Sequence, residues 1–178
     1  AGQAPFRLRP LSSNVRRHAA ALFAMHPEDN LRALGLQLPG AGVPAGNYAT
    51  AVRANDLLFV SARAPAAIGG TLTEGRMGQR YSAADGYLLA QSACLELLAI
   101  VKQHAGTLEA VAQIVELQGF LNADPSFEED AQVLDGASDL LAKVFGSVGI
   151  HARSVVGENS LRKGVPLTLR AVVQLKTK

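Results

Sequence analysis

The chain has 178 residues, of which 48% are hydrophobic, and a formal net charge of +2. This length and composition predict one globular domain that buries about 70% of the surface its unfolded chain exposes. The small charge, the absence of a basic run and the lack of tryptophan argue against nucleic acid as a partner. The single cysteine, Cys94, excludes an intrachain disulfide and is consistent with a reducing, cytoplasmic location.

Residues 1–28 are expected to form an N-terminal extension ahead of one domain at 29–178. Arg16 and Arg17 precede an apolar run at 19–25, a faint likeness to an export signal, but the run is too short for an ordinary one. Three interpretations of the extension stay open: an expression-tag remnant, an upstream segment or a packing arm. No stretch approaches the roughly 18 apolar residues of a membrane-spanning helix, so no membrane partner is expected.

The first part of the domain combines a short helix with a hairpin. A helical turn is predicted at 29–36, and two prolines and three glycines at 38–46 predict a linker. Apolar-rich strands are predicted at 48–53 and 57–63, joined by the polar turn 54–56. The loop that follows has glycines at 69, 70 and 75 but no lysine followed by serine or threonine, the pair that completes a phosphate-binding loop, so it predicts flexible turns.

Two helices flank a buried strand in the middle of the chain. Ser82 and Asp85 predict the start of a helix that runs to about 104 and ends at Gly106. Residues 111–121 are too densely apolar for a strand exposed on both faces. Ser126 and Glu129 then stand at capping-box spacing, which predicts a second helix up to Phe145. Gly136 within it costs about 1 kcal/mol relative to alanine, which indicates close packing or a break there.

The chain closes on two further strands, at 151–161 and 165–175, predicted to form a terminal hairpin across a polar turn at 162–164. Arg153 lies in the first of them, and an arginine in an apolar strand is costly to bury unless an anion pairs with it. That anion is a bound carboxylate or an internal or subunit-interface partner; both alternatives stay open. The order is ββαβαββ, an α+β fold whose mixed sheet is covered on one face by two helices.

Five segments in this order resemble the YjgF/RidA (reactive intermediate deaminase) family, also labelled endoribonuclease L-PSP. The resemblance covers about residues 30 to 175. It rests on Gly46-Asn47-Tyr48, on Leu57 to Pro65, on Val133 to Leu141, on His151-Ala-Arg-Ser154 with Leu161 eight residues after the arginine, and on the closing hydrophobic strand.

The resemblance implies a chorismate-mutase-like fold and a homotrimer whose sheets form an inner barrel, with pockets between subunits. In deaminating members the arginine that matches Arg153 holds the carboxylate of a 2-imino acid. A glutamate on the last strand helps to position or activate water, and the residues matching Tyr48 and Ser61 line the cleft. A small anionic metabolite is therefore the expected partner, and no cofactor or metal is expected.

The chain departs from this pattern where the acids should stand. Counting from Arg153, the glutamate position is Thr168, and the next outward residue is Arg170. Arg63 replaces a glutamine, so we count Arg63, Ser154 and Arg170 with the substrate-binding candidates. If Arg153, Arg170 and Arg63 approach one cleft, the site gains positive charge and loses its acid.

Other candidates are weaker. Asp135 stands where an asparagine is common in the family. Glu158 could replace the missing acid only if a bulge near Gly157 turned it to the face of Arg153. The four histidines show no metal-ligand spacing, and His151 is interpreted as a packing residue before a catalytic one.

Three functions follow as hypotheses. The first is hydrolytic deamination of 2-imino or enamine acids, with Arg153 and Thr168 as the catalytic candidates. The second is a non-catalytic or divergent trimer that binds a small anionic metabolite, because threonine replaces the acid. The third, an endoribonuclease or translation inhibitor, is only weakly supported by the charge and the few aromatic residues.

Overall fold

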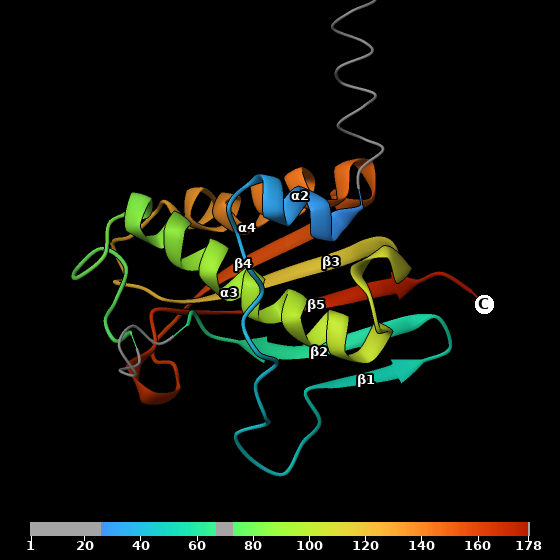
Figure 1. Cartoon of the computed structure of the whole chain (residues 1–178). Coiled ribbons are helices and arrows are strands. Elements are labelled where there is room, and N and C mark those ends of the chain that lie inside the picture. The colour runs from blue at the N-terminus through green and yellow to red at the C-terminus, as the bar shows by residue number, and fades with distance from the viewer. Residues whose placement is uncertain (1–25, 67–72, 178) are drawn as a thin grey trace, which may run out of the picture.

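The computed structural model describes residues 26–66 and 73–177 (Figure 1). Most of the predicted N-terminal extension and the glycines at 69 and 70 therefore lie outside the described residues. The predicted class is confirmed: helices lie on a mixed sheet of five strands in the order β1-β2-β5-β3-β4. The strands are β1 (Ala51–Ala54), β2 (Leu57–Arg63), β3 (Val111–Asn122), β4 (Ala152–Glu158) and β5 (Leu167–Leu175).

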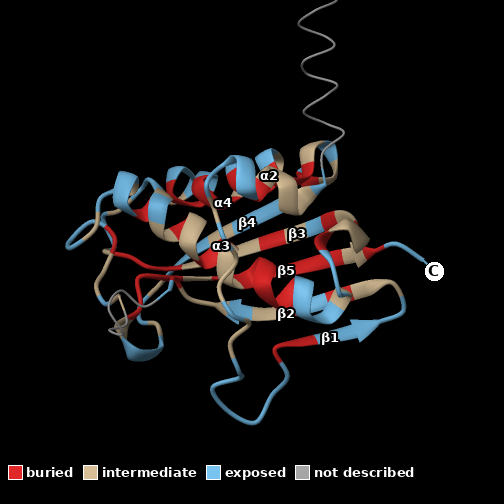
Figure 2. Cartoon of the chain, in the orientation of Figure 1, coloured by how far each residue is buried: buried red, intermediate tan, exposed pale blue. Residues whose placement is uncertain are grey.

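The predicted terminal hairpin is wrong, because β4 and β5 are not neighbours. β5 lies between β2 and β3 and pairs antiparallel with both, whereas β4 runs parallel to β3 at the edge of the sheet. The 3-10 turn η3 (Arg162–Gly164) separates them, with Lys163 at φ +55° and Gly164 at φ +64°. The alternation of apolar and polar residues along a strand shows which face is buried, but it does not show which other strands pair with that strand. Burial agrees with these positions: the central strand β5 is largely buried, and the edge strand β4 is largely exposed (Figure 2).

The long helices α3 (Ala83–Ala105) and α4 (Asp130–Phe145) cover one face of the sheet. The predicted ends of α3 are confirmed: Ser82 and Asp85 form a capping box and Gly106 is the C-cap. The predicted capping box of α4 is wrong. The backbone and hydroxyl of Ser126 both donate to Asp124 Oδ1, so these residues form a local turn and the helix begins four residues later.

Close packing at Gly136 is confirmed. α3 and α4 touch where a Cβ at Gly136 would collide with the carbonyl oxygen of Tyr87. Gly86 makes the reciprocal approach, because an added Cβ there would lie 2.6 Å from a methyl of Val133.

By length and composition α3 could also cross a membrane, since its most apolar window has a mean hydropathy of 1.4. Half of that window is buried in the fold, where α3 packs on α4 and the sheet.

The hydrophobic core lies between the helices and the sheet. Leu58 of β2, Leu117 of β3 and Leu169 of β5 point into it and are fully buried. Leu97 of α3 and Leu141 of α4 meet them from the helix layer. The opposite face of the sheet carries no helix among the described residues, and we call it the open face (Figure 1).

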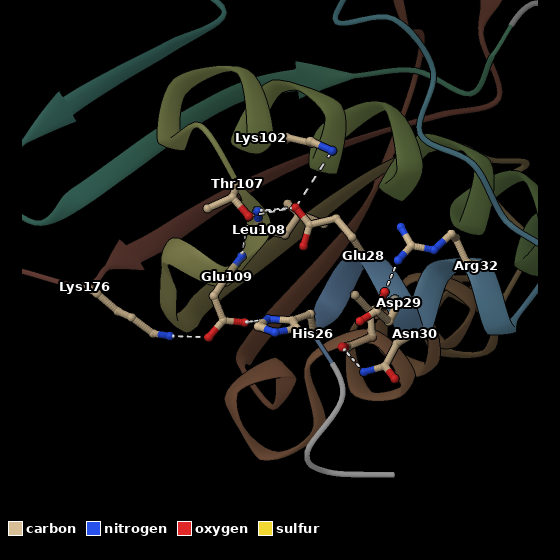
Figure 3. A network of polar contacts seen from close by, with 11 residues as sticks. His26, Glu28, Asp29, Asn30, Arg32, Lys102, Thr107, Leu108, Glu109 and Lys176 are labelled. Carbon is tan, nitrogen blue, oxygen red and sulfur yellow. Dashed lines mark hydrogen bonds and ion pairs between the residues drawn. The ribbon is translucent and has the colours of Figure 1, made fainter.

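A short helix, α2 (Pro27–Ala33), is tied to the domain by the polar network of Figure 3. Glu28 accepts hydrogen bonds from the Leu108 backbone at 2.8 Å and the Thr107 hydroxyl at 2.9 Å. Asn30 donates to the carbonyl of Val144 at the end of α4. The boundary predicted between residues 28 and 29 thus falls inside a helix that is bound to the domain.

Candidate functional site

Arg153 projects from the edge strand β4 on the side of the helices. Its Nη1 donates to Asp135 Oδ1 at 2.6 Å and to the Ser138 hydroxyl at 3.2 Å, both on α4. The side chain is 27% exposed, so the guanidinium stays open to solvent although it has an internal carboxylate partner. Of the two alternatives for its counter-ion, the ion pair within the chain is present.

His151 completes this cluster. Its Nδ1 lies 2.7 Å from the carbonyl oxygen of Gly149, so that nitrogen is the one that donates. Nε2 can then accept from the Ser138 hydroxyl at 3.1 Å. The contacts orient Ser138 toward Arg153 and agree with a packing and orienting role for His151. Asp135 adds a negative charge to this cluster: an asparagine at this position could accept the hydrogen bond of Arg153 but would not neutralise it.

A cleft of about 520 Å³ lies apart from this cluster, where β2 ends and β5 begins. Three predicted site residues line it together: Tyr48, Arg63 and Thr168. Its other polar lining comes from the cations Arg162 and Lys163 of η3 and from Glu96 of α3; the rest of the lining is mostly small and apolar. The cleft therefore has three positive side chains and, among its described lining residues, one carboxylate.

A bulge decides where Arg63 points. The pairing of β2 with β5 slips between Val60 and Arg63, which places Arg63 opposite Leu169 on the helix side. Its guanidinium lies against Gly42, where an added Cβ would collide with Nη2. The bulge thus brings Arg63 toward Glu96 of α3, where its charge partly offsets the rise that burial causes in the pKa of Glu96.

The remaining predicted residues lie outside the cleft lining. The Ser61 hydroxyl donates to the Ala49 carbonyl at 2.8 Å, which fixes the segment before β1. Ser154 and Arg170 both pair with Gln118, so all three side chains share the open face. The predicted convergence of Arg153, Arg170 and Arg63 on one cleft is absent from the described chain.

Arg153 and Thr168 lie on opposite faces of the sheet. Arg153 pairs with the buried Leu117, whereas Thr168 pairs with Phe120, three positions along the same strand. Side chains alternate along a strand, so an odd separation places the two partners on opposite faces. Within one chain these two residues cannot bind the same small molecule.

Glu158 does not replace the missing acid. The pairing of β4 with β3 runs without a shift from Ala152 to Glu158, so the bulge that would turn Glu158 is absent. Its side chain lines a different hollow of about 380 Å³ together with Arg76 and Asp130. Burial raises the pKa of Asp130, but this hollow contains none of the predicted site residues.

Sequence reasoning missed Glu96. Burial raises the pKa of its carboxyl above the ordinary value, and the charge of Arg63 opposes that rise. Glu96 follows Ser92 by one helical turn, and the Ser92 hydroxyl accepts from the Ala66 backbone at 3.0 Å. Its i+4 spacing from Ser92 marks one helix face, but only the fold shows that this face borders the cleft.

Nowhere in the described ranges do three potential metal ligands gather.

The five-stranded mixed sheet lies under two long helices, with Arg63 in a cleft and Arg153 at the sheet edge. This is the arrangement of a chorismate-mutase-like α+β protein. A family model described as "YjgF/chorismate mutase-like, putative endoribonuclease" matches residues 28–176, so the chain belongs to this family.

Three relatives are similar over most of the chain. Protein TCP17 of Trypanosoma cruzi is 38% identical over 148 residues, which are 82% of this chain and 92% of that protein. The crystal structure of a "putative endoribonuclease" from Shewanella oneidensis is 33% identical, with a TM-score of 0.82, over 85% of this chain and all of that one. Atu1372 of Agrobacterium tumefaciens, a protein of unknown function, is 30% identical with a TM-score of 0.77, over 90% of this chain and 99% of that one.

Proposed function

We propose that the chain is a hydrolase of reactive 2-imino acids and their enamine tautomers, which acts at clefts between the copies of a homotrimer. Family membership supports this proposal. The single observation that carries it is the position of Arg153, a solvent-reached guanidinium at the edge of the sheet beside a polar cluster. A planar guanidinium suits a carboxylate, which can exchange with Asp135.

The division of the site supports a shared cleft. Arg153 faces the helices at one edge of the sheet, while Tyr48 and Thr168 line a cleft elsewhere in the same chain. The two halves can act on one substrate only if different copies supply them. A trimer would bring the edge strand of one copy to the cleft of the next, and this is the arrangement that we propose.

The reaction needs few groups. Water adds to the carbon of the C=N bond, and the resulting carbinolamine loses ammonia to leave a 2-oxo acid. Arg153 would hold the substrate carboxylate, which fixes the imine carbon relative to a bound water and lowers the entropy cost of the encounter. The Thr168 hydroxyl would hydrogen-bond that water, since a threonine is too weak a base to deprotonate it near neutral pH.

The test is hydrolysis of 2-iminopropanoate and 2-iminobutanoate generated in situ, with Arg153→Ala beside the unaltered protein. Loss of a charge-assisted hydrogen bond of about 1.5–3 kcal/mol predicts a fall of roughly 10- to 100-fold in kcat/KM. Arg80→Ala is the matched control, because Arg80 is exposed and stacks on Tyr81 at 5.6 Å. A folded, trimeric protein that does not accelerate either reaction would refute the proposal.

A second candidate is a trimer that binds a small anion without turning it over. The observation that favours it is the lining of the cleft by Arg63, Arg162 and Lys163, with Thr168 at the position of the family's acid. The same assay distinguishes the two, because this candidate predicts saturable binding of pyruvate without imine hydrolysis.

An endoribonuclease activity is the third candidate, supported by the description of the family and the name of the Shewanella protein. Cleavage of RNA, with binding that weakens steeply as salt rises, would favour it over the other two.

A further inference from the structure

The cleft between β2 and η3 contains a carboxyl group that the proposed reaction can use. Glu96 of α3 is the one acid among the described residues of its lining. The other polar residues of the lining are Tyr48, Thr168 and the cations Arg63, Arg162 and Lys163. The cleft thus has one carboxylate and three cations in its described lining. Its volume of about 520 Å³ is large enough for a small anion and a water molecule.

The local structure holds Glu96 toward this space. One turn earlier on α3, Ser92 accepts a hydrogen bond from the Ala66 backbone, which fixes the segment after β2 against the helix. That segment, Ala64 to Ala66, forms one wall of the cleft. Residues four apart lie on the same side of a helix, so Glu96 follows Ser92 onto the cleft side.

The environment also matches the chemistry. Burial raises the pKa of Glu96, and the positive charge of Arg63 limits the rise. A carboxylate that is more basic than usual accepts a proton from water more readily, while the neighbouring cation favours its ionised form. Thr168, the other residue of this lining at a family site position on β5, has only a hydroxyl, which does not take a proton from water near neutral pH.

We propose that Glu96 is the catalytic base of the deamination, accepting a proton of the attacking water in this cleft. This inference rests on the proposed function. As the water oxygen bonds to the imine carbon, one of its protons passes to the Glu96 carboxylate, and the electron pair of the C=N bond moves to nitrogen. The carboxyl returns that proton to the nitrogen, which gives the neutral carbinolamine with one C–OH and one C–NH2 bond. The carboxylate then takes the hydroxyl proton and delivers it to the amine as the C=O bond forms and the C–N bond breaks. One water is consumed, and one 2-oxo acid and one ammonia are released.

The test compares Glu96→Gln with the unaltered protein in the imine-hydrolysis assay. The amide keeps the size of the side chain but cannot accept a proton, so kcat should fall by about 10²- to 10⁴-fold while KM changes little. The pH–rate profile is the second readout. The unaltered protein should lose activity as the pH falls through the pKa of Glu96, and this acidic limb should be missing from the residual activity of the variant.

Glu158→Gln is the matched control, because Glu158 is a partly buried acid that lines a different hollow. It should leave kcat and the acidic limb unchanged. If Glu96→Gln unfolds because Arg63 loses its counter-charge, Glu96→Asp takes its place. Aspartate keeps the charge but withdraws the carboxyl by one methylene group, and kcat should still fall at least tenfold.

Two results would overturn the inference, and they differ. Folded Glu96 variants with unaltered kcat and an unaltered acidic limb would reduce Glu96 to a partner of Arg63, while the deaminase activity of the wild type would stand. An unaltered protein without imine-hydrolase activity would overturn the proposed function and the role of Glu96 together.

Discussion

Gly136 shows how one residue sets the distance between the two long helices. The absence of a side chain lets α4 approach the backbone of α3 at Tyr87, and Gly86 lets Val133 of α4 approach in return. The same helix carries Asp135 and Ser138, the two partners of Arg153. The contact at Gly136 therefore also positions the polar cluster at the edge of the sheet.

Gly136→Ala should destabilise the protein by about 3 kcal/mol, because the added methyl meets backbone rather than a movable side chain. The free energy of unfolding from urea titration measures the effect. Gly157→Ala is the matched control: an added Cβ there would lie 3.9 Å from its nearest neighbour, so stability should change by less than about 0.5 kcal/mol. Equal stability of the two variants would contradict the close approach of the helices.

At the scale of elements, α2 shows how a short helix is held by a few polar contacts. It has seven residues, too few to be stable alone, and one of its side chains, Leu31, is buried in the core. Glu28 supplies the strongest tie. Burial by itself would raise the pKa of this carboxyl, but hydrogen bonds from the Leu108 backbone and the Thr107 hydroxyl lower it below 4.5.

Glu28→Gln should cost about 1–2 kcal/mol, since the lost hydrogen bonds are charge-assisted and partly buried. Because the folded pKa is lowered, the contribution of Glu28 is fully present above pH 4.5 and is lost as the pH falls through the folded value. Thermal unfolding at pH 7 should therefore separate the variant from the wild type, and the difference should shrink toward pH 3.

The control for Glu28 is Asp29→Asn, which removes an acid whose partner, Arg32, lies within the same helix. Such an exposed pair contributes little, so the midpoint of unfolding should fall by no more than about 2 °C. A Glu28 variant as stable as this control at pH 7 would show that α2 docks without the carboxylate.

At the scale of the whole molecule, none of the helices within 26–66 and 73–177 covers the open face of the sheet. Pairing aligns Val52, Phe59 and Val172 across β1, β2 and β5 on that face, and Val52 and Phe59 are 58% and 40% exposed. Val156 of the edge strand, 46% exposed, lies on the same face. Apolar side chains in this arrangement are typical of a surface that another chain covers, which supports the proposed trimer.

Phe59→Glu should therefore break the assembly, because a charge would be buried where an aromatic ring packs. Light scattering with gel filtration should show the mass falling from that of three 18.6 kDa chains to that of one. Leu88→Glu is the control: Leu88 is 62% exposed on α3, away from the open face. A trimer that persists in Phe59→Glu would locate the subunit contacts elsewhere.

Local signals were enough for much of the fold. The alternation of Leu167, Leu169, Ala171, Val173 and Leu175 matches buried positions of β5, where Val172 is buried as well. Capping residues correctly predicted both ends of α3. The start of α4 was missed for a local reason too, because Asp124 competes for the donors of Ser126. Periodicity and capping depend on residues within a few positions of each other, so the sequence by itself determined the type and order of the main elements.

Only the tertiary structure decided how those elements combine. It placed β5 between β2 and β3, set Arg153 and Thr168 on opposite faces and, through a bulge, turned Arg63 toward Glu96. It also paired Arg153 with Asp135 across 18 residues. These relations depend on register and pairing between distant segments, and spacing along the chain does not encode them. The residue types of the site could thus be predicted from the sequence, whereas their grouping came from the fold.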